Sequence, residues 1–120
     1  MVTQTFSKRR RLRAHSEFRR AQSGGKRSSQ GGVAMLVDRS PLGAEAQARL
    51  GMVVSRKVGT AVKRNSIKRW LREWFRTRGE LLPRGIDLVV IAKRGAAERG
   101  HRALLDDVDS LLTRVARLLA

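Results

Sequence analysis

The side chains of this sequence that could do chemistry are mostly cations. The 120 residues include 27 Lys and Arg but only 10 Asp and Glu, which gives a formal net charge of +17. An excess of this size works against compaction unless a polyanion relieves it, so it predicts a nucleic-acid partner. Cysteine is absent and histidine occurs twice, which excludes a zinc finger, a zinc ribbon and a cysteine nucleophile.

Acid–base or metal-assisted cleavage of a phosphodiester needs convergent carboxylates or a pair of histidines. His15 and His101 are far apart in the sequence, and we interpret each as a surface or capping residue. Asp106, Asp107 and Asp109 fall on a predicted helix, where we expect solvated carboxylates on its outer face. The sequence therefore predicts no catalytic residue and no metal ligand in the protein.

The most basic structured element is a helix that we expect over residues 61–78. Apolar side chains recur there at i, i+3, i+4, i+7 and i+8, and this arc is expected in the core: Ile67, Trp70, Leu71, Trp74 and Phe75. The opposite side carries donors in a row long enough to follow a phosphate backbone: Asn65, Lys68, Arg69, Arg72 and Arg76. Glu73 lies beside this row as an i, i+4 partner for Arg69.

The remaining pattern predicts the elements that hold this helix. In order, we expect a basic arm (1–15), a short helix (16–22), a polar stretch (26–32), strands over 33–37, 50–54 and 86–92, and a C-terminal core helix with an apolar stripe from Leu104 to Leu119. This order predicts one α+β or mixed α/β domain over residues 1–120 with three or four strands. Neither a membrane span nor a signal peptide is visible, so we expect a cytoplasmic protein.

A basic connector over residues 55–60 joins the second strand to the long helix. Free backbone N–H groups and the positive end of the helix dipole attract phosphate at such a place. Gly59 would let the chain pass close to a ligand, although one glycine does not make a Walker motif.

The connector and the long helix together carry a specific motif: Lys57, Gly59, Ala61, Arg64, Asn65, Lys68, Arg69, Arg72 and Glu73. This motif resembles the signature of the protein subunit of bacterial ribonuclease P. The resemblance extends over nearly the whole chain, including Arg11-Leu12-Arg13 before a first helix that bears Phe18. It implies an α-β-β-β-α-β-α order around a four-stranded mixed sheet with a left-handed β-α-β crossover, similar to the second domain of a small-subunit ribosomal protein. Handedness rules alone predict a right-handed crossover.

The resemblance also implies a function. The family removes the 5′ leader from precursor tRNA as a ribonucleoprotein whose RNA subunit carries the metal-dependent catalysis. Mg²⁺ would then be held mainly by the RNA, and none by the protein alone. The implied partners are ribonuclease P RNA and precursor tRNA, without a membrane or an obligate protein partner. The alternative is a ribosomal or general RNA-binding protein with no role in RNA cleavage.

By the same resemblance, residues are assigned to two RNA surfaces. The catalytic RNA would contact Arg56, Lys57, Gly59, Arg64, Asn65, Lys68, Arg69 and Arg72. The leader of precursor tRNA would contact Arg11, Arg13, Phe18, Gln22, Leu36 and Ser55. Ser66 stands where the family has a cation, and Gln22 and Leu36 stand where aromatic residues are expected. We therefore expect leader contacts to depend more on charge than on base stacking.

Overall fold

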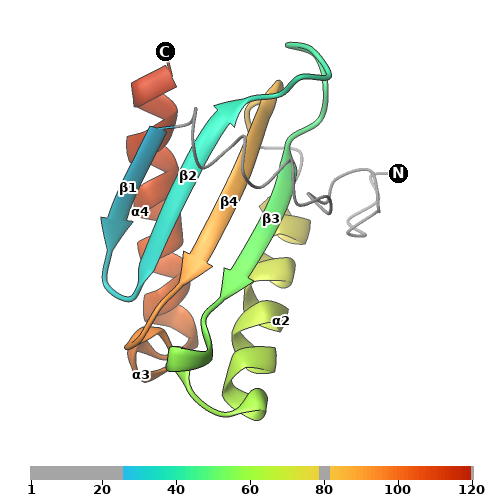
Figure 1. The fold of residues 1–120 in the computed structure, drawn as a ribbon. Coiled ribbons are helices and arrows are strands. Elements are labelled where there is room, and N and C mark those ends of the chain that lie inside the picture. The colour runs from blue at the N-terminus through green and yellow to red at the C-terminus, as the bar shows by residue number, and fades with distance from the viewer. Residues whose placement is uncertain (1–25, 79–81, 120) are drawn as a thin grey trace.

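The computed structural model describes residues 26–78 and 82–119, so the expected basic arm and first helix lie outside the described residues. Within this part, four strands form a sheet, and helices cover one of its faces (Figure 1). In chain order the elements are β1 (Lys26–Gln30), β2 (Val33–Arg39), β3 (Arg49–Val54), the 3-10 turn η2 (Arg56–Val58), α2 (Ala61–Arg78), β4 (Ile86–Ala92), α3 (Ala96–Arg99) and α4 (His101–Leu119).

The four strands form one mixed sheet in the order β1-β2-β4-β3. β2 is antiparallel to both β1 and β4, whereas β3 and β4 are parallel. The four-stranded mixed sheet implied by the resemblance is therefore confirmed. The expected long helix is α2, with the bounds that the apolar pattern predicts, and β4 also has its predicted bounds.

The central strands β2 and β4 are apolar along most of their length because both of their faces are buried. Successive side chains point to opposite faces of the sheet. Met35 and Val90 therefore pack in the main core beneath the helices. Leu36 and Val89, which are aligned with each other, form a second cluster on the other face.

The polar stretch expected over residues 26–32 contains β1, which the apolar pattern did not predict. This edge strand has the sequence KRSSQ, and it is held by the neighbouring strand β2 and by α4, which lies far along the chain. It pairs with β2, and Arg114 of α4 donates hydrogen bonds to Ser28 Oγ at 2.9 Å and to Gln30 Oε1 at 2.7 Å. The contacts with α4 leave no local sequence signal, and the polar composition of β1 gives no apolar pattern.

The connection from β3 through α2 to β4 is left-handed. In Figure 1 both strands point down the page, β4 lies to the left of β3, and α2 returns behind the sheet. The chain thus descends in front, rises behind and shifts to the left, which is the sense of a left-handed turn. The structure confirms the crossover implied by the resemblance and contradicts the general handedness rule.

The main core lies between the sheet and the two long helices. α2 contributes Ile67, Leu71, Trp74 and Phe75, and α4 contributes Leu104, Val108, Leu111 and Val115. Trp70, expected in the same buried arc, is only half-buried and stacks on His101, with 5.0 Å between ring centroids. Among the described helices, none is long and apolar enough to cross a membrane.

Two of the three acids on α4 are engaged by other side chains, and one of them, Asp107, is buried, contrary to the sequence prediction of solvated carboxylates. Asp107 is 2% exposed and accepts hydrogen bonds from Gln30 and Arg99. Asp109 accepts a hydrogen bond from Trp74 Nε1 at 2.7 Å and pairs with Arg78. The donors come from β1, α3 and α2, so both carboxylates tie α4 to neighbouring elements, while Asp109 stays partly exposed to water.

Candidate nucleic-acid interface

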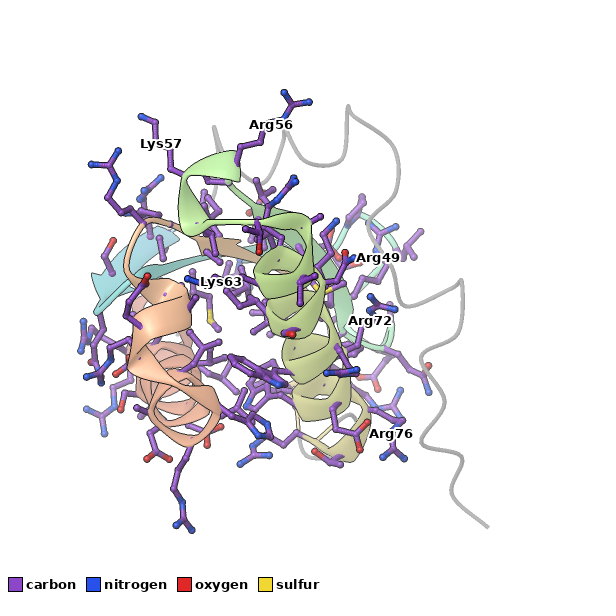
Figure 2. The ribbon with its side chains drawn as sticks, turned by 90° about the horizontal axis from the view of Figure 1, so that it is seen from below. Arg49, Arg56, Lys57, Lys63, Arg72 and Arg76 are labelled. Atoms are coloured by element: carbon purple, nitrogen blue, oxygen red, sulfur yellow. The ribbon has the colours of Figure 1, made fainter. Side chains whose placement is uncertain are left out.

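The connector between β3 and α2 is built to expose two cations. The Ser55 hydroxyl accepts a hydrogen bond from the Lys57 backbone N–H at 3.1 Å, and Val58 is buried at 3% exposure. This anchors η2 at both ends, so that Arg56 and Lys57 project into solvent (Figure 2). Gly59 then adopts a φ of +146°, a conformation that favours glycine.

α2 begins close to these cations without an acid in its first turn. Thr60 Oγ1 accepts a hydrogen bond from the Lys63 N–H at 3.3 Å. The positive end of the helix dipole therefore adds to the charges of Arg56 and Lys57. A β-carbon at Gly59 would lie 2.9 Å from Lys63 Cδ, so the connector passes directly over the first turn of the helix.

A row of polar side chains runs along the side of α2 that faces away from the core. We call it the α2 row; its members are Asn65, Lys68, Arg69 and Arg72. All are exposed except Lys68, which is half-buried. Among the described residues, none of the three cations of the row has an ion-pair partner. Their charge therefore remains available to an external anion.

Arg64 differs from the row because it lies at the border between the outer side of α2 and the core. Its side chain is half-buried, and its Nε is buried without a hydrogen bond to any described residue. A buried donor without a partner is uncommon in native proteins. Arg64 is therefore included in the candidate interface because of this donor without a partner among the described residues, whereas Arg69 and Arg72 are included because they are exposed.

Glu73 pairs with Arg76, not with Arg69 as the sequence suggested. Arg76 Nε donates to Glu73 Oε2 at 3.2 Å, and a second contact joins Arg76 Nη2 to Glu73 Oε1. The hydrogen bond from Arg76 lowers the pKa of the Glu73 carboxyl. Arg76 lies at the end of the predicted donor row, and this pair offsets its charge.

Away from the α2 row, several arginines are already neutralised by carboxylates. Arg49 makes a two-bond contact with the fully buried Asp87, with distances of 2.8 and 2.9 Å. Arg78 pairs with Asp109, and Arg99 pairs with Asp107. The hydrogen bond from Arg99 lowers the pKa of Asp107. Anion binding is therefore favoured where the cations lack such partners, along α2 and η2.

The residues predicted to contact the leader are not assembled by the described part of the chain. Leu36 is 2% exposed and lies on the sheet face that is turned away from α2. Ser55 caps η2. The other four members, Arg11, Arg13, Phe18 and Gln22, lie outside the described residues.

His101 is the first residue of α4, exposed and stacked on Trp70 with an interplanar angle of 21°. It borders a shallow groove of about 320 Å³ that Asp106 and Asp109 also line. Because Asp109 is held by Arg78 and Trp74, the groove does not present a free carboxylate pair.

Three further cations near η2 are not singled out by the sequence pattern. Lys63 belongs to the first turn of α2, and Lys93 and Arg94 follow β4. Their signal in the sequence is weak. Cations follow the second and third expected strands, but these cations come close together only because the two strands pair in parallel. That pairing is not visible in a local pattern.

Comparisons with known proteins agree with this geometry. The chain matches the sequence profile of the family described as Ribonuclease P over residues 6–116. It is 37% identical over 101 residues to the ribonuclease P protein component of Thermotoga maritima, covering 84% of each chain, and 34% identical over 110 residues to that of Syntrophus aciditrophicus, covering 92% of this chain and 90% of the relative.

Solved structures give the same result. The RNase P protein of Staphylococcus aureus superposes with a TM-score of 0.80 at 26% identity, covering 88% of this chain and 94% of that one. The RNase P protein of Thermotoga maritima superposes with a TM-score of 0.75 at 33% identity, covering 88% and 96%. With fold, motif and exposed basic helix in agreement, the chain belongs to the ribonuclease P protein family.

Proposed function

We propose that this chain is the protein subunit of ribonuclease P and that it binds the RNA subunit through the α2 row together with Arg56 and Lys57. The observation that carries this proposal is that Lys68, Arg69 and Arg72 of the α2 row form no ion pair with any described residue, in a chain that belongs to the family. Each phosphate that such a cation neutralises releases condensed counterions, which supplies affinity without reading sequence. Asn65 adds hydrogen bonds and orientation.

The chemistry of cleavage is assigned to the RNA subunit. The buried carboxylates Asp87 and Asp107 are each engaged by an arginine, and the described residues contain no cluster of three or more metal-ligating side chains. The described side chains therefore do not fit a Mg²⁺ site. In this proposal Mg²⁺ is held mainly by RNA, and the protein contributes binding and orientation.

Precursor tRNA is the proposed second partner, with its 5′ leader contacting Phe18, Gln22, Leu36, Ser55 and the arginines of the N-terminal arm. Removal of that leader gives the mature tRNA 5′ end. No obligate protein partner and a cytoplasmic location are part of the same proposal. The family match favours this function over a general RNA-binding protein.

The test is the salt dependence of binding to ribonuclease P RNA. Each lost phosphate contact lowers the log–log slope by about 0.7–0.9, so Arg69→Ala combined with Arg72→Ala should lower it by about 1.4–1.8. If affinity at 1 M salt is unchanged, this corresponds to about 25- to 60-fold weaker binding at 0.1 M.

The matched control removes two exposed cations from α4, by Arg102→Ala with Arg117→Ala. Its net charge changes equally, so a general charge effect would act on both double variants. The proposal predicts a much larger slope change for the α2 pair. Equal slopes in the two double variants would place the RNA on another surface.

A further inference from the structure

The carboxyl ends of β3 and β4 bring two pairs of cations to the same edge of the sheet. Val54 is aligned with Ala92 in the parallel register, and the Ser55 N–H donates to the Ala92 carbonyl at 3.1 Å. Adjacent strands lie about 4.8 Å apart. The sequences that follow, Arg56-Lys57 and Lys93-Arg94, therefore leave the sheet side by side.

The segment after β4 is held firmly in place. The Lys93 N–H donates to the Gly32 carbonyl at 2.7 Å, and the Ala96 N–H donates to the Lys93 carbonyl at 3.1 Å. A β-carbon at Gly32 would lie only 2.5 Å from the Ala96 backbone nitrogen, so only glycine allows this close approach. The turn between β1 and β2 thus packs against the backbone that carries Lys93 and Arg94. The backbone of this segment therefore has little conformational freedom to lose when a ligand binds.

These cations lie around the carboxyl ends of β3 and β4 and the start of α2. We call this group, together with Lys63, the strand-end patch; its members are Arg56, Lys57, Lys63, Lys93 and Arg94. All are exposed except Lys93, which is half-buried. Figure 2, seen from below, shows Lys63 pointing from α2 to the side opposite Arg72 and Arg76.

No member of the patch has an ion-pair partner among the described residues. The acid closest in sequence to Arg94 is Glu98 of α3, which is exposed and forms no ion pair with it. The positive end of the α2 dipole lies at the same edge. The patch is therefore a second place where an anion meets unpaired charge.

We propose that Lys93 and Arg94 bind the phosphate backbone of the catalytic RNA, extending its contact from the α2 row around the start of α2 onto the strand ends. This inference rests on the proposed function. The patch includes Arg56 and Lys57, which are proposed contacts of the catalytic RNA. Of the two described leader contacts, Ser55 adjoins the patch and Leu36 lies on the far face of the sheet. The two shared residues favour the catalytic RNA over the leader as the partner of Lys93 and Arg94. Contacts on two differently oriented surfaces fix the rotation of the protein on the RNA, which a single helix face does not.

The test uses full-length variants and ribonuclease P RNA over a series of monovalent salt concentrations. Lys93→Ala with Arg94→Ala should lower the log–log slope by about 1.4–1.8, with about 25- to 60-fold weaker binding at 0.1 M salt if affinity at 1 M is unchanged. Arg94→Ala alone should give about half the slope change, and because Arg94 is exposed this variant keeps the packing of the loop.

A matched control is available on β1. Lys26 and Arg27 are also an adjacent Lys–Arg pair, exposed and at the opposite end of the sheet. Replacing both with Ala removes the same two charges, and we expect a slope close to that of wild type. Thermal unfolding of each variant distinguishes a lost contact from a lost fold.

The possible outcomes distinguish a failure of this inference from a failure of the proposed function on which it rests. If wild-type protein does not bind ribonuclease P RNA, the proposed function is wrong. If wild type binds and the α2-row variant is weakened while the Lys93 and Arg94 variants match wild type, only the further inference is wrong. A loss confined to precursor tRNA that carries a leader, with unchanged affinity for the catalytic RNA, would also overturn it.

Discussion

Asp107 joins β1 and α3 to α4, and its replacement by Asn gives a quantitative test of how the fold is held. Its Oδ1 accepts hydrogen bonds from Gln30 Nε2 at 2.9 Å and from Arg99 Nη2 at 3.0 Å. Its Oδ2 accepts from Arg99 Nε at 2.9 Å. The Asp107 side chain is 3% exposed, so water does not replace these donors easily.

Asp107→Asn keeps the size of the side chain but removes its charge and turns an N–H₂ group toward Arg99 or Gln30. Hydrogen bonds to charged groups contribute about 1.5–3 kcal/mol. The loss is limited because the Arg99 side chain is 45% exposed and can be solvated again. We expect the free energy of unfolding at pH 7, measured in urea, to fall by about 2–3 kcal/mol.

The same variant has a defined pH dependence. The hydrogen bond from Arg99 lowers the pKa of Asp107 in the folded state. The stabilisation is therefore fully present above the unfolded pKa of about 3.9 and is lost as pH falls through the lower folded value. The difference between wild type and Asp107→Asn should be constant near neutral pH and shrink below about pH 4.

The control for this experiment is the neighbouring acid. Asp106 is exposed, so Asp106→Asn should change the free energy of unfolding by no more than about 0.5 kcal/mol. A stability difference for Asp107→Asn that is absent at pH 7, or that persists unchanged to pH 3, would refute the reasoning from these hydrogen bonds.

Two further substitutions test the backbone support and the electrostatics of the interface. Gly32→Ala should reduce the free energy of unfolding by about 1–3 kcal/mol in urea, because its β-carbon meets the Ala96 backbone and the segments must separate; unchanged stability would contradict the close approach. Glu73→Gln should strengthen binding to ribonuclease P RNA and raise the salt slope by up to about 0.7–0.9, because it removes a carboxylate that offsets positive charge beside the α2 row; weaker binding would show that Glu73 orients the interface.

The sequence predicts best those elements whose own pattern is decisive. α2 and β4 have the predicted bounds because a buried arc at helical spacing and a short apolar run each define one element. β2 and β3 were also found, but β2 continues to Arg39 and β3 begins at Arg49. The apolar pattern does not include Arg49 because arginine is charged. The strand includes it because Asp87 of β4 pairs with this buried charge.

The features that the sequence did not reveal depend on contacts between distant segments. β1 is polar and is ordered by β2 and Arg114. Asp107 is buried because its donors come from β1 and α3, which helical periodicity alone does not show. The left-handed crossover came only from the resemblance, since the general rule predicts the opposite hand.

The candidate interface was predicted in part. The composition predicts a nucleic-acid partner, and the helical pattern separates the outer row of α2 from its core side. The assignment of individual contacts to the catalytic RNA or the leader stays a prediction. Lys93 and Arg94 joined the surface only through the parallel register of β3 and β4.

The central claim is tested most directly by reconstitution with ribonuclease P RNA, precursor tRNA and a series of Mg²⁺ concentrations. The account predicts that the RNA-free protein leaves precursor tRNA intact at every Mg²⁺ concentration, and that adding the protein to the RNA subunit increases cleavage at the 5′ leader junction. The variant with Arg69→Ala and Arg72→Ala should give this increase only at higher protein concentration. Site-specific cleavage by RNA-free protein, or an RNA subunit whose cleavage is unaffected by the protein, would contradict the account.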